Sequence, residues 1–504
     1  MITLAGLAVA TAAAAGLTWV NAGAPAAAAA CIRSGTDAAV QAALNGAGAQ
    51  AVLCPGAVID VSHTITFTAP DQVIETQGLP TDSTRATFLL ASNSVTTAIS
   101  GGSQAGVTVE NVQVDGQLSE LGRGSGGALL EMGDGGTGQV VQHVYAHDTR
   151  SWSTLHFDEG NVTDSVPQCQ QAKILDNTIG PAGVAVTDQW ADGISLACGN
   201  STVQGNTVQD ATDGGIVIFG APGSLVSKNT IVAETRTLLG GINLVDYAPM
   251  NGNYTGTDVT GNTIDAEGAF IKVGIAMGPN IWSCSTDINY GATVTGNTLA
   301  GDHMGYGYAV NGVRDFTITG NTDTSHHVGA IGSGCNGLPS EPTGFQVQNQ
   351  SGSTLQSQFT SASLGYLLAI TQMPASGSTI SLRAHTDSNF VTAPDAGAQP
   401  LIANRTAIGP WEQFTLADEA GGTVALRSDA NNDYVTAGTS SLTASSTTVG
   451  AAQEFTLIQN SDGSISLKSS VNGDYVTAAD AGAQPLIANR TAIGPWEEFD
   501  LIQG

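Results

Sequence analysis

A short phrase built on Asn-Thr recurs along the middle of the chain and constrains the fold more than any other feature. Successive asparagines lie 29, 23, 33, 35 and 24 residues apart, at Asn177, Asn206, Asn229, Asn262, Asn297 and Asn321. A repeat of about 20–50 residues is typical of a solenoid. An alternating segment precedes each phrase, and a variable loop and a second apolar strand, such as residues 193–196, follow it. We therefore predict two or three short strands per coil and an all-β fold, a right-handed parallel β-helix.

Asparagine suits the recurring corner of such a coil. It tolerates left-handed backbone, and its amide can hydrogen-bond to the asparagine of the next coil in a ladder. The alternative, a leucine-rich solenoid, does not fit the leucine spacing. Residues 36–44 have the pattern of a short amphipathic helix with Thr36 or Asp37 as N-cap. We expect this helix to cover the open sheet edge of the first coil.

A different repeat occupies the last part of the chain. Three units open with an Ile/Val-x-Leu segment whose leucines, Leu382, Leu426 and Leu467, lie 44 and 41 residues apart. Each unit continues into an aromatic residue followed by Val-Thr-Ala. Three all-β units of roughly 40 residues predict a β-trefoil.

The first and third of these units share the run DAGAQPLIANRTAIGPWE, at residues 395–412 and 480–497, whereas the middle unit has GAAQE at 450–454. The run resembles the fascin-like β-trefoils appended to secreted glycan hydrolases, which implies a carbohydrate-binding module. An indole can stack on a sugar ring while a neighbouring carboxylate accepts from its hydroxyls.

We therefore expect two sugar sites, one at Trp411 with Glu412 and one at Trp496 with Glu497. Two sites on one module would gain avidity on a polymer. The alternative is that both tryptophans fill the trefoil core, a place that phenylalanines two or three residues later can take instead.

Charge narrows the class of partner. The formal net charge is −29, from 43 acidic and 14 basic side chains. Such a surface repels nucleic acid and anionic membranes, so we expect neither as a partner. A neutral polysaccharide fits this charge better than an acidic one.

The N-terminal segment and the cysteines indicate export. Residues 1–30 are almost wholly small and apolar and end in an alanine tract, which predicts a secretory signal peptide and an extracellular protein. A membrane anchor is the alternative. Six cysteines form an even set, so disulfides are expected, with Cys31–Cys54 the predicted first pair. We divide the chain into a signal peptide (1–30), a β-helix domain (31–373) and a β-trefoil (374–504).

Two aspartates enter equivalent predicted strands one coil apart, Asp192 before Gly-Ile-Ser-Leu and Asp213 before Gly-Gly-Ile-Val-Ile. Stacked coils lie about 4.8 Å apart, so these carboxylates are expected on one face at a separation suited to glycoside hydrolysis. Repulsion between them in a partly desolvated site would raise one pKa and favour a protonated acid.

This region resembles the polygalacturonase-like β-helix glycoside hydrolases, a group that includes α-glucan-cleaving relatives. Their motif is an Asp-Gly pair followed about one coil later by a double Asp. Asp192 and Gly193 match the first part and Asp213 the second, but Gly214 replaces the other aspartate. The His-Gly and Arg-x-Lys motifs of the pectin-cleaving members are also missing, which argues against galacturonan as substrate.

Other side chains are candidates for the same site, and a structural role in a turn or ladder is the alternative for each. The additional candidate carboxylates are Asp188, Asp158 and Asp246, and the candidate substrate-binding residues are Trp190, His156, Trp152, Asn243, Tyr247 and Lys272. His156 is expected to align with the outward-facing Ser195 and Asn243.

We predict a secreted glycoside hydrolase that cleaves a polysaccharide, a neutral glucan above all, with inversion. Asp213 or Asp192 donates the proton and another carboxylate activates water. Two alternatives stay open: a polysaccharide lyase using Lys272, Arg236 or Arg150, and a non-catalytic glycan-binding surface protein. We expect a monomer without a cofactor. No cysteine or histidine spacing matches a metal site, so we expect no metal either.

Overall fold

The computed structural model describes residues 31–184, 189–327, 342–365, 367, 376–377, 379–418, 423–459 and 464–503. The predicted signal peptide and the predicted domain boundary at residues 373 and 374 lie outside the described residues. The fold is all-β: a right-handed parallel β-helix is followed by a β-trefoil. None of the helices in these described ranges is long and apolar enough to span a membrane.

Three parallel sheets, which we call A, B and C, form the β-helix, and each coil passes through them in that order. Sheet A contains β2 Gln50–Leu53, β5 Val73–Thr76, β8 Thr108–Glu110, β11 Val140–Gln142, β16 Lys173–Leu175, β19 Thr202–Gln204, β22 Leu225–Ser227, β25 Asp258–Thr260, β29 Thr293–Thr295, β32 Thr317–Thr319 and β35 Thr354–Leu355. Sheet B contains β1 Gly35–Thr36, β3 Val58–Val61, β6 Ala86–Leu90, β9 Val112–Asp115, β12 Tyr145–His147, β17 Thr178–Ile179, β20 Thr207–Gln209, β23 Thr230–Val232, β26 Thr263–Ala266, β30 Thr298–Gly301 and β33 Thr322–Asp323.

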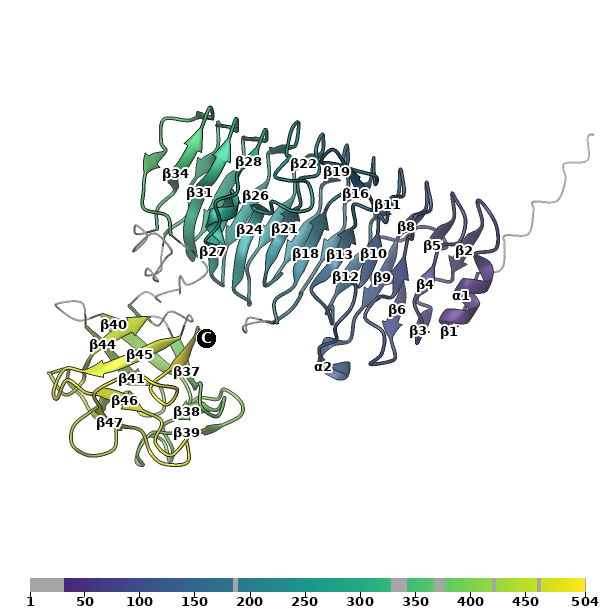
Figure 1. Cartoon of the computed structure of the whole chain (residues 1–504). Helices are drawn as coiled ribbons and strands as arrows, with labels where there is room; N and C mark the ends of the chain where they lie inside the picture. Colours follow the sequence, from purple (N-terminus) through teal and green to yellow (C-terminus); the bar gives the residue numbers. More distant parts are fainter. Residues whose placement is uncertain are drawn as a thin grey trace, which may run out of the picture.

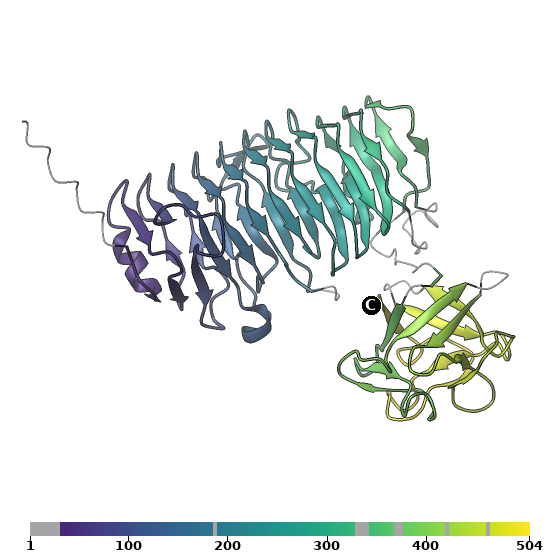
Figure 2. The same ribbon diagram turned by 180° about the vertical axis from the view of Figure 1, so that it is seen from behind.

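Sheet C carries the functional candidates. It contains β4 Ile65–Thr66, β7 Ile99–Ser100, β10 Leu130–Met132, β13 Ser153–Phe157, β18 Asp192–Leu196, β21 Gly214–Ile218, β24 Leu238–Leu244, β27 Ile271–Met277, β28 Asn289–Tyr290, β31 Met304–Arg314, β34 Phe345–Ser351 and β36 Thr360–Ser361. Loop elements add α2 Leu118–Leu121, the 3-10 helix η1 Pro279–Ile281 and the hairpin β14 Val162–Thr163 with β15 Val166–Pro167. The coils stack along one axis (Figures 1 and 2). Their inward side chains form one continuous apolar core.

The predicted asparagine ladder is present at the corner between sheets A and B. Each side-chain amide donates to the side-chain oxygen of the next asparagine at 2.9–3.0 Å, from Asn177 through to Asn321. The left-handed conformation, however, belongs to the residue before each asparagine, such as Asp176, Lys228 or Gly261. The asparagine therefore satisfies buried backbone groups, and the preceding residue makes the turn, which corrects the expectation that asparagine does both.

A column of glycines explains the recurring Gly-Ile pairs. Gly193, Gly215, Gly241, Gly274, Gly307 and Gly344 occupy one register position of sheet C, and a Cβ on any of the first five would lie 2.4–3.1 Å from the carbonyl oxygen of the next glycine. Only glycine allows the coils to approach this closely. This column lies directly beside Asp192, because Gly193 follows Asp192 in β18.

The predicted helix forms as α1 Asp37–Ala43 and covers the first coil. The Thr36 side chain makes no capping bond. The Gln41 side chain pairs with the open edge of β4. Its Nε2 donates to the Thr66 carbonyl at 2.9 Å, and its Oε1 accepts from the backbone N–H of Thr66 at 2.8 Å. The helix thus acts as a substitute strand at an otherwise unpaired edge.

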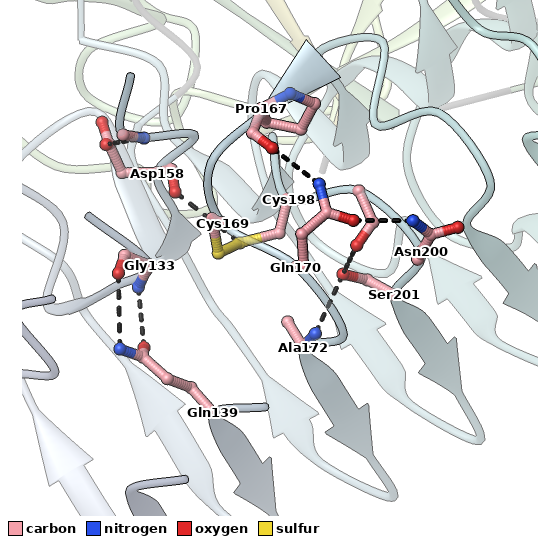
Figure 3. The surroundings of a disulfide bond; sticks show 12 residues. Gly133, Gln139, Asp158, Pro167, Cys169, Gln170, Ala172, Cys198, Asn200 and Ser201 are labelled. Carbon is pink, nitrogen blue, oxygen red and sulfur yellow. Dashed lines mark hydrogen bonds between the residues drawn. A yellow bond between two sulfur atoms is a disulfide. The ribbon is translucent and has the colours of Figure 1, made fainter. Parts of the chain in front are cut away.

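The predicted Cys31–Cys54 disulfide is present and joins this N-terminal segment to β2. A second disulfide, Cys169–Cys198, links two successive coils at the corner between sheets C and A (Figure 3). Around it, Asn200 donates to the Gln170 side chain, which itself donates to the Pro167 carbonyl, each at 2.6 Å. Both bridges fit an oxidising location.

The C-terminal module has twelve strands in three units of four. They are β37 Thr379–Ala384, β38 Phe390–Thr392, β39 Ile402–Arg405, β40 Phe414–Asp418, β41 Val424–Ser428, β42 Tyr434–Thr436, β43 Thr443–Ser446, β44 Glu454–Gln459, β45 Ile465–Ser469, β46 Tyr475–Thr477, β47 Ile487–Arg490 and β48 Phe499–Gln503. The antiparallel pairs β37–β40, β40–β41, β41–β44, β44–β45, β45–β48 and β48–β37 close a six-stranded barrel.

The remaining strands form three hairpins, β38–β39, β42–β43 and β46–β47. The backbones of Leu401, Leu442 and Leu486 bond in a closed ring at 2.8–2.9 Å, one leucine from each unit. Threefold symmetry of this kind defines the predicted β-trefoil.

Candidate active site

Register places the two predicted catalytic aspartates on neighbouring coils. Ile194 pairs with Ile216, so Asp192 lies opposite Gly214, and Asp213 is one residue earlier on its strand. The Asp192 carboxylate accepts from the Gly214 amide at 3.1 Å, so its side chain lies over the adjacent strand. The predicted proximity of the pair is therefore present, with an offset of one residue.

Asp192 is almost fully buried, at 4% exposure, on the outer side of β18. The Ser195 hydroxyl donates to its other oxygen at 2.8 Å, and Ser153 Oγ lies 2.8 Å from Ser195 Oγ. Burial raises the pKa of Asp192 well above its ordinary value, and the negative charges of Asp213 and Asp246 add to this, while the bonds from Ser195 and Gly214 oppose it.

Asp213 is partly exposed and immediately precedes β21. Burial raises its pKa to about 6, against the opposing effect of the Arg123 guanidinium. Arg123 is held by the carbonyls of Ser151 and Trp190, both at 2.7 Å. The loop before β10 thus brings a positive charge close to Asp213.

Asp246 follows β24 and completes a group of three carboxylates. Burial raises its pKa to about 7, and the charge of Asp213 contributes. The Tyr254 hydroxyl donates to the Asp246 carbonyl at 3.0 Å and to the Ile218 carbonyl at 2.7 Å, which fixes the loop. The charge of Asp213 raises the pKa of both Asp192 and Asp246, and the charge of Asp246 adds to the shift of Asp192, so we treat the three carboxylates as one electrostatic unit, the aspartate triad.

Lys272 shares a register position with Asp213, two coils further on. Between β24 and β27, Leu238 pairs with Ile271 and Gly240 with Val273, so Lys272 lies opposite Leu239. On the preceding coil, Leu239 lies opposite Asp213, because Gly240 pairs with Gly214. Two coils separate their backbones by roughly 10 Å. Burial lowers the pKa of Lys272 to about 8.

Asn243 lies over two glycines beside Asp192. A Cβ on Gly240 would meet its side-chain oxygen at 2.1 Å, and a Cβ on Gly214 would meet its nitrogen at 2.8 Å and Asp192 Oδ1 at 3.5 Å. Among the residues that the structure describes, the buried oxygen of Asn243 has no hydrogen-bond partner.

A second group forms one to two coils toward the N-terminus. His156 aligns with Ser195 and Asn243 as predicted, and its Nδ1 lies 2.5 Å from Glu131 Oε1. Asp158 belongs to this group, because a carboxylate oxygen of Glu131, a ring nitrogen of His156 and a carboxylate oxygen of Asp158 all lie within 4.8 Å of one another. Its carboxylate accepts from the Gly160 amide at 2.7 Å. The structure thus places Asp158 with His156 instead of with the aspartate triad.

The remaining candidates border these groups. Trp152 is 37% exposed and contacts His156 edge to face at 4.8 Å, and Tyr247 is 36% exposed beside Asp246. Trp190 is partly exposed, and its carbonyl is bound by Arg123. Asp188 lies outside the described residues.

Two basic residues considered for lyase chemistry have structural tasks. The fully buried Arg150 donates to five backbone carbonyls, those of Gly122, Ser92, Val95, Asn93 and Leu121. Arg236 donates to the Gly183 carbonyl at 2.5 Å. Arg150 is therefore unable to neutralise a substrate carboxylate.

Sequence reasoning missed Arg123, Ser153 and the bonding role of Ser195. Arg123 comes from a loop about seventy positions before Asp192, without a local motif around it. The two serines carry a weaker signal, since their register follows once the Gly-Ile strands are aligned.

In the trefoil the two predicted tryptophans are exposed, Trp411 at 40% and Trp496 at 36%, while Phe414 and Phe499 are fully buried in the core. The alternative that the tryptophans fill the core is wrong. Arg490 lies over Trp496 at 6.0 Å from the ring centre.

The two glutamates have a structural task that the sequence did not indicate. Glu412 and Glu497 are each 5% exposed, and each accepts from the amide of the glycine three residues earlier, Gly409 or Gly494, at 2.9 Å. Gln453 makes the same bond to Gly450 in the middle unit, where Ala452 replaces the tryptophan. The glutamates therefore close the turn that presents the indole, which corrects their predicted role as sugar acceptors.

Comparison with known proteins gives no family. No family model matches the chain, and no curated protein matches it. Solved structures that match include a designed threefold-symmetric protein, ThreeFoil (18% identity, TM-score 0.23, covering 25% of this chain and 97% of that one). Another is the BEL β-trefoil (14% identity, TM-score 0.24, covering 26% of this chain and 97% of that one). A third is a Macrolepiota procera ricin B-like lectin in complex with lactose (15% identity, TM-score 0.24, covering 26% of this chain and 100% of that one).

Proposed function

We propose that the chain is an exported glycoside hydrolase that cleaves O-glycosidic bonds of a polysaccharide, a neutral glucan above all, by acid/base catalysis at the aspartate triad. The observation that carries the proposal is that three carboxylates on consecutive coils of one outer face all have raised pKa values. Such shifts concentrate at catalytic sites, because an acid must keep its proton near the working pH.

The two printed pKa values support a division of roles. Between pH 6 and 7, Asp213 is mostly ionised while Asp246 mostly keeps its proton. We assign Asp213 as the base that activates water and either Asp246 or Asp192, on the coils after and before Asp213, as the acid that protonates the leaving oxygen. An activated water between acid and base gives inversion at the anomeric carbon.

The surroundings can hold a sugar against these carboxylates. Trp152 and Tyr247 offer exposed aromatic rings at the border of the site, on which a sugar ring can stack. On the trefoil, Trp411 and Trp496 offer two more exposed rings. We propose that the trefoil holds the polymer while the solenoid cleaves it.

The test is a product screen on α-glucans, β-glucans, fructans, arabinans and pectins, with release of reducing ends as the readout. The wild type should release reducing ends from one of the neutral polymers, and Asp192→Asn and Asp213→Asn should lose this activity. Asp60→Asn, on the exposed side of β3, is the matched control and should keep it. Wild-type turnover in both site variants would refute the assignment.

A lyase is the second candidate, and one observation favours it: the lowered pKa of Lys272 allows this lysine to act as a base near pH 8. A lyase forms unsaturated products from uronate polymers, so absorbance of the products on pectin distinguishes the two. Retention on glycan without any product would indicate a non-catalytic binding protein.

A further inference from the structure

The outer face of sheet C changes character along the helix axis. One outward register position runs from Glu131 through His156, Ser195 and Val217 to Asn243, and this part is mainly polar. At the next two coils the same position holds Ala276 and Ala309. A parallel register position changes from Asp192, Gly214 and Gly240 to Val273 and Tyr306.

The apolar part is covered by the chain that follows the last coil. Val273, Ala276, Tyr306 and Ala309 are at most 1% exposed and form one cluster with Leu364 and Leu367. We call these six residues the stop cluster. Ile281 of η1 joins the same cluster from the side.

Hydrogen bonds fix this covering segment in place. The Asn311 side chain donates to the Leu364 carbonyl at 2.7 Å, and the Leu364 amide donates to the Gln348 side chain at 2.7 Å. Both partners lie on sheet C, in β31 and β34. Leu364 is therefore held by its backbone as well as by its side chain, and the cover is part of the fold.

The position of the stop cluster limits what can lie on the site. Ala276 is one coil beyond Asn243, roughly 5 Å, and Val273 is three coils beyond Asp192, roughly 14 Å. A polymer that follows the polar residues along the axis meets buried apolar side chains there. Toward the N-terminus, this face continues with the Glu131–His156 pair and the exposed aromatic ring of Trp152.

We propose, on the basis of the proposed hydrolase function, that the stop cluster makes the enzyme exo-acting. The end of a polysaccharide chain abuts the cluster, the bond at the aspartate triad is cleaved, and the remaining polymer extends over His156 and Trp152. The released product then has one short length, set by the coils between the triad and the cluster.

The test follows the first products from linear gluco-oligosaccharides of uniform length, labelled at the reducing end, with the linkage that the wild type cleaves. A single product length from the first turnovers, and no cleavage of the same glucan in a cross-linked dyed gel, support exo action. A mixture of lengths, together with release of dye, overturns it. Absence of any new reducing end overturns the hydrolase proposal itself, which is a different result.

Opening the cover tests the cause. Leu364→Gly with Leu367→Gly should lose the single product length and gain cleavage of the cross-linked gel, whereas Ser357→Ala, at an exposed site of the same terminal region, should behave as wild type. A folded double variant that keeps a single product length would refute the role of the cluster. If the double variant does not fold, the wild-type product pattern alone decides.

Discussion

Replacing Asp246 with asparagine should stabilise the protein at high pH while it removes activity. The folded-state pKa of Asp246 is raised from 3.8 to about 7, so the fold disfavours the ionised form. The native state therefore loses stability as pH rises from 3.8 through about 7, and the loss is complete above that value. Three pKa units correspond to about 4 kcal/mol, which partial exposure reduces to about 2–3 kcal/mol.

Asparagine has nearly the same shape as aspartate and carries no charge, so the free energy of unfolding of Asp246→Asn should not fall with pH in this way. We expect its free energy of unfolding to exceed that of the wild type by about 2 kcal/mol near pH 8, and to equal it below about pH 3, where Asp246 is protonated in both the unfolded and the folded wild type. Hydrolysis should fall by about 10²–10⁴, the usual contribution of a general acid.

The assay is urea denaturation at both pH values, followed by circular dichroism, together with release of reducing ends. Asp60→Asn serves as the control, because Asp60 is an exposed residue of β3, and it should change neither quantity. If Asp246→Asn is less stable than the wild type near pH 8, or hydrolyses glucan at the wild-type rate, the reasoning is refuted.

Three further predictions address the scaffold and the trefoil. Asn206→Ala removes a bond to the Ile174 carbonyl and the acceptor of two Asn177 donors, so it should lower the free energy of unfolding by about 3 kcal/mol; an unchanged urea midpoint would contradict the ladder's role. Gly215→Ala places a Cβ 2.6 Å from a neighbouring carbonyl oxygen, and should destabilise the β-helix by about 1–3 kcal/mol in the same assay. Trp411→Ala with Trp496→Ala should weaken retention on insoluble glucan while hydrolysis of soluble oligosaccharides stays unchanged, and retention equal to the wild type would exclude these rings as the binding surface.

Periodicity made the fold predictable. The asparagine interval and the Gly-Ile pairs are local patterns whose physical causes, a buried amide ladder and close approach of coils, act at every repeat. For the same reason the register could be predicted to within one residue, which brought Asp192 and Asp213 together. Asp246 was placed near them because it follows the next strand of the same sheet.

What sequence could not predict depends on contacts between distant segments. Arg123 reaches the site from a loop two coils away. Arg150 donates its hydrogen bonds to backbone carbonyls, and no sequence pattern indicates these partners. The structural task of Glu412 depends on the geometry of its own turn. The contact of Leu364 with the outer face of sheet C could not be predicted either, because the sequence does not show which face an apolar residue after the last coil will cover.

The most direct test of the aspartate triad is the pH dependence of kcat/KM on the glucan that the wild type hydrolyses. A base with a pKa of about 6 must be ionised and an acid with a pKa of about 7 must be protonated, so the rate should rise through the first value, fall through the second and peak between them. In Asp213→Asn the residual rate should lose the acidic limb. A profile that is flat across this range, or one that Asp213→Asn leaves unchanged, would contradict catalysis by these carboxylates.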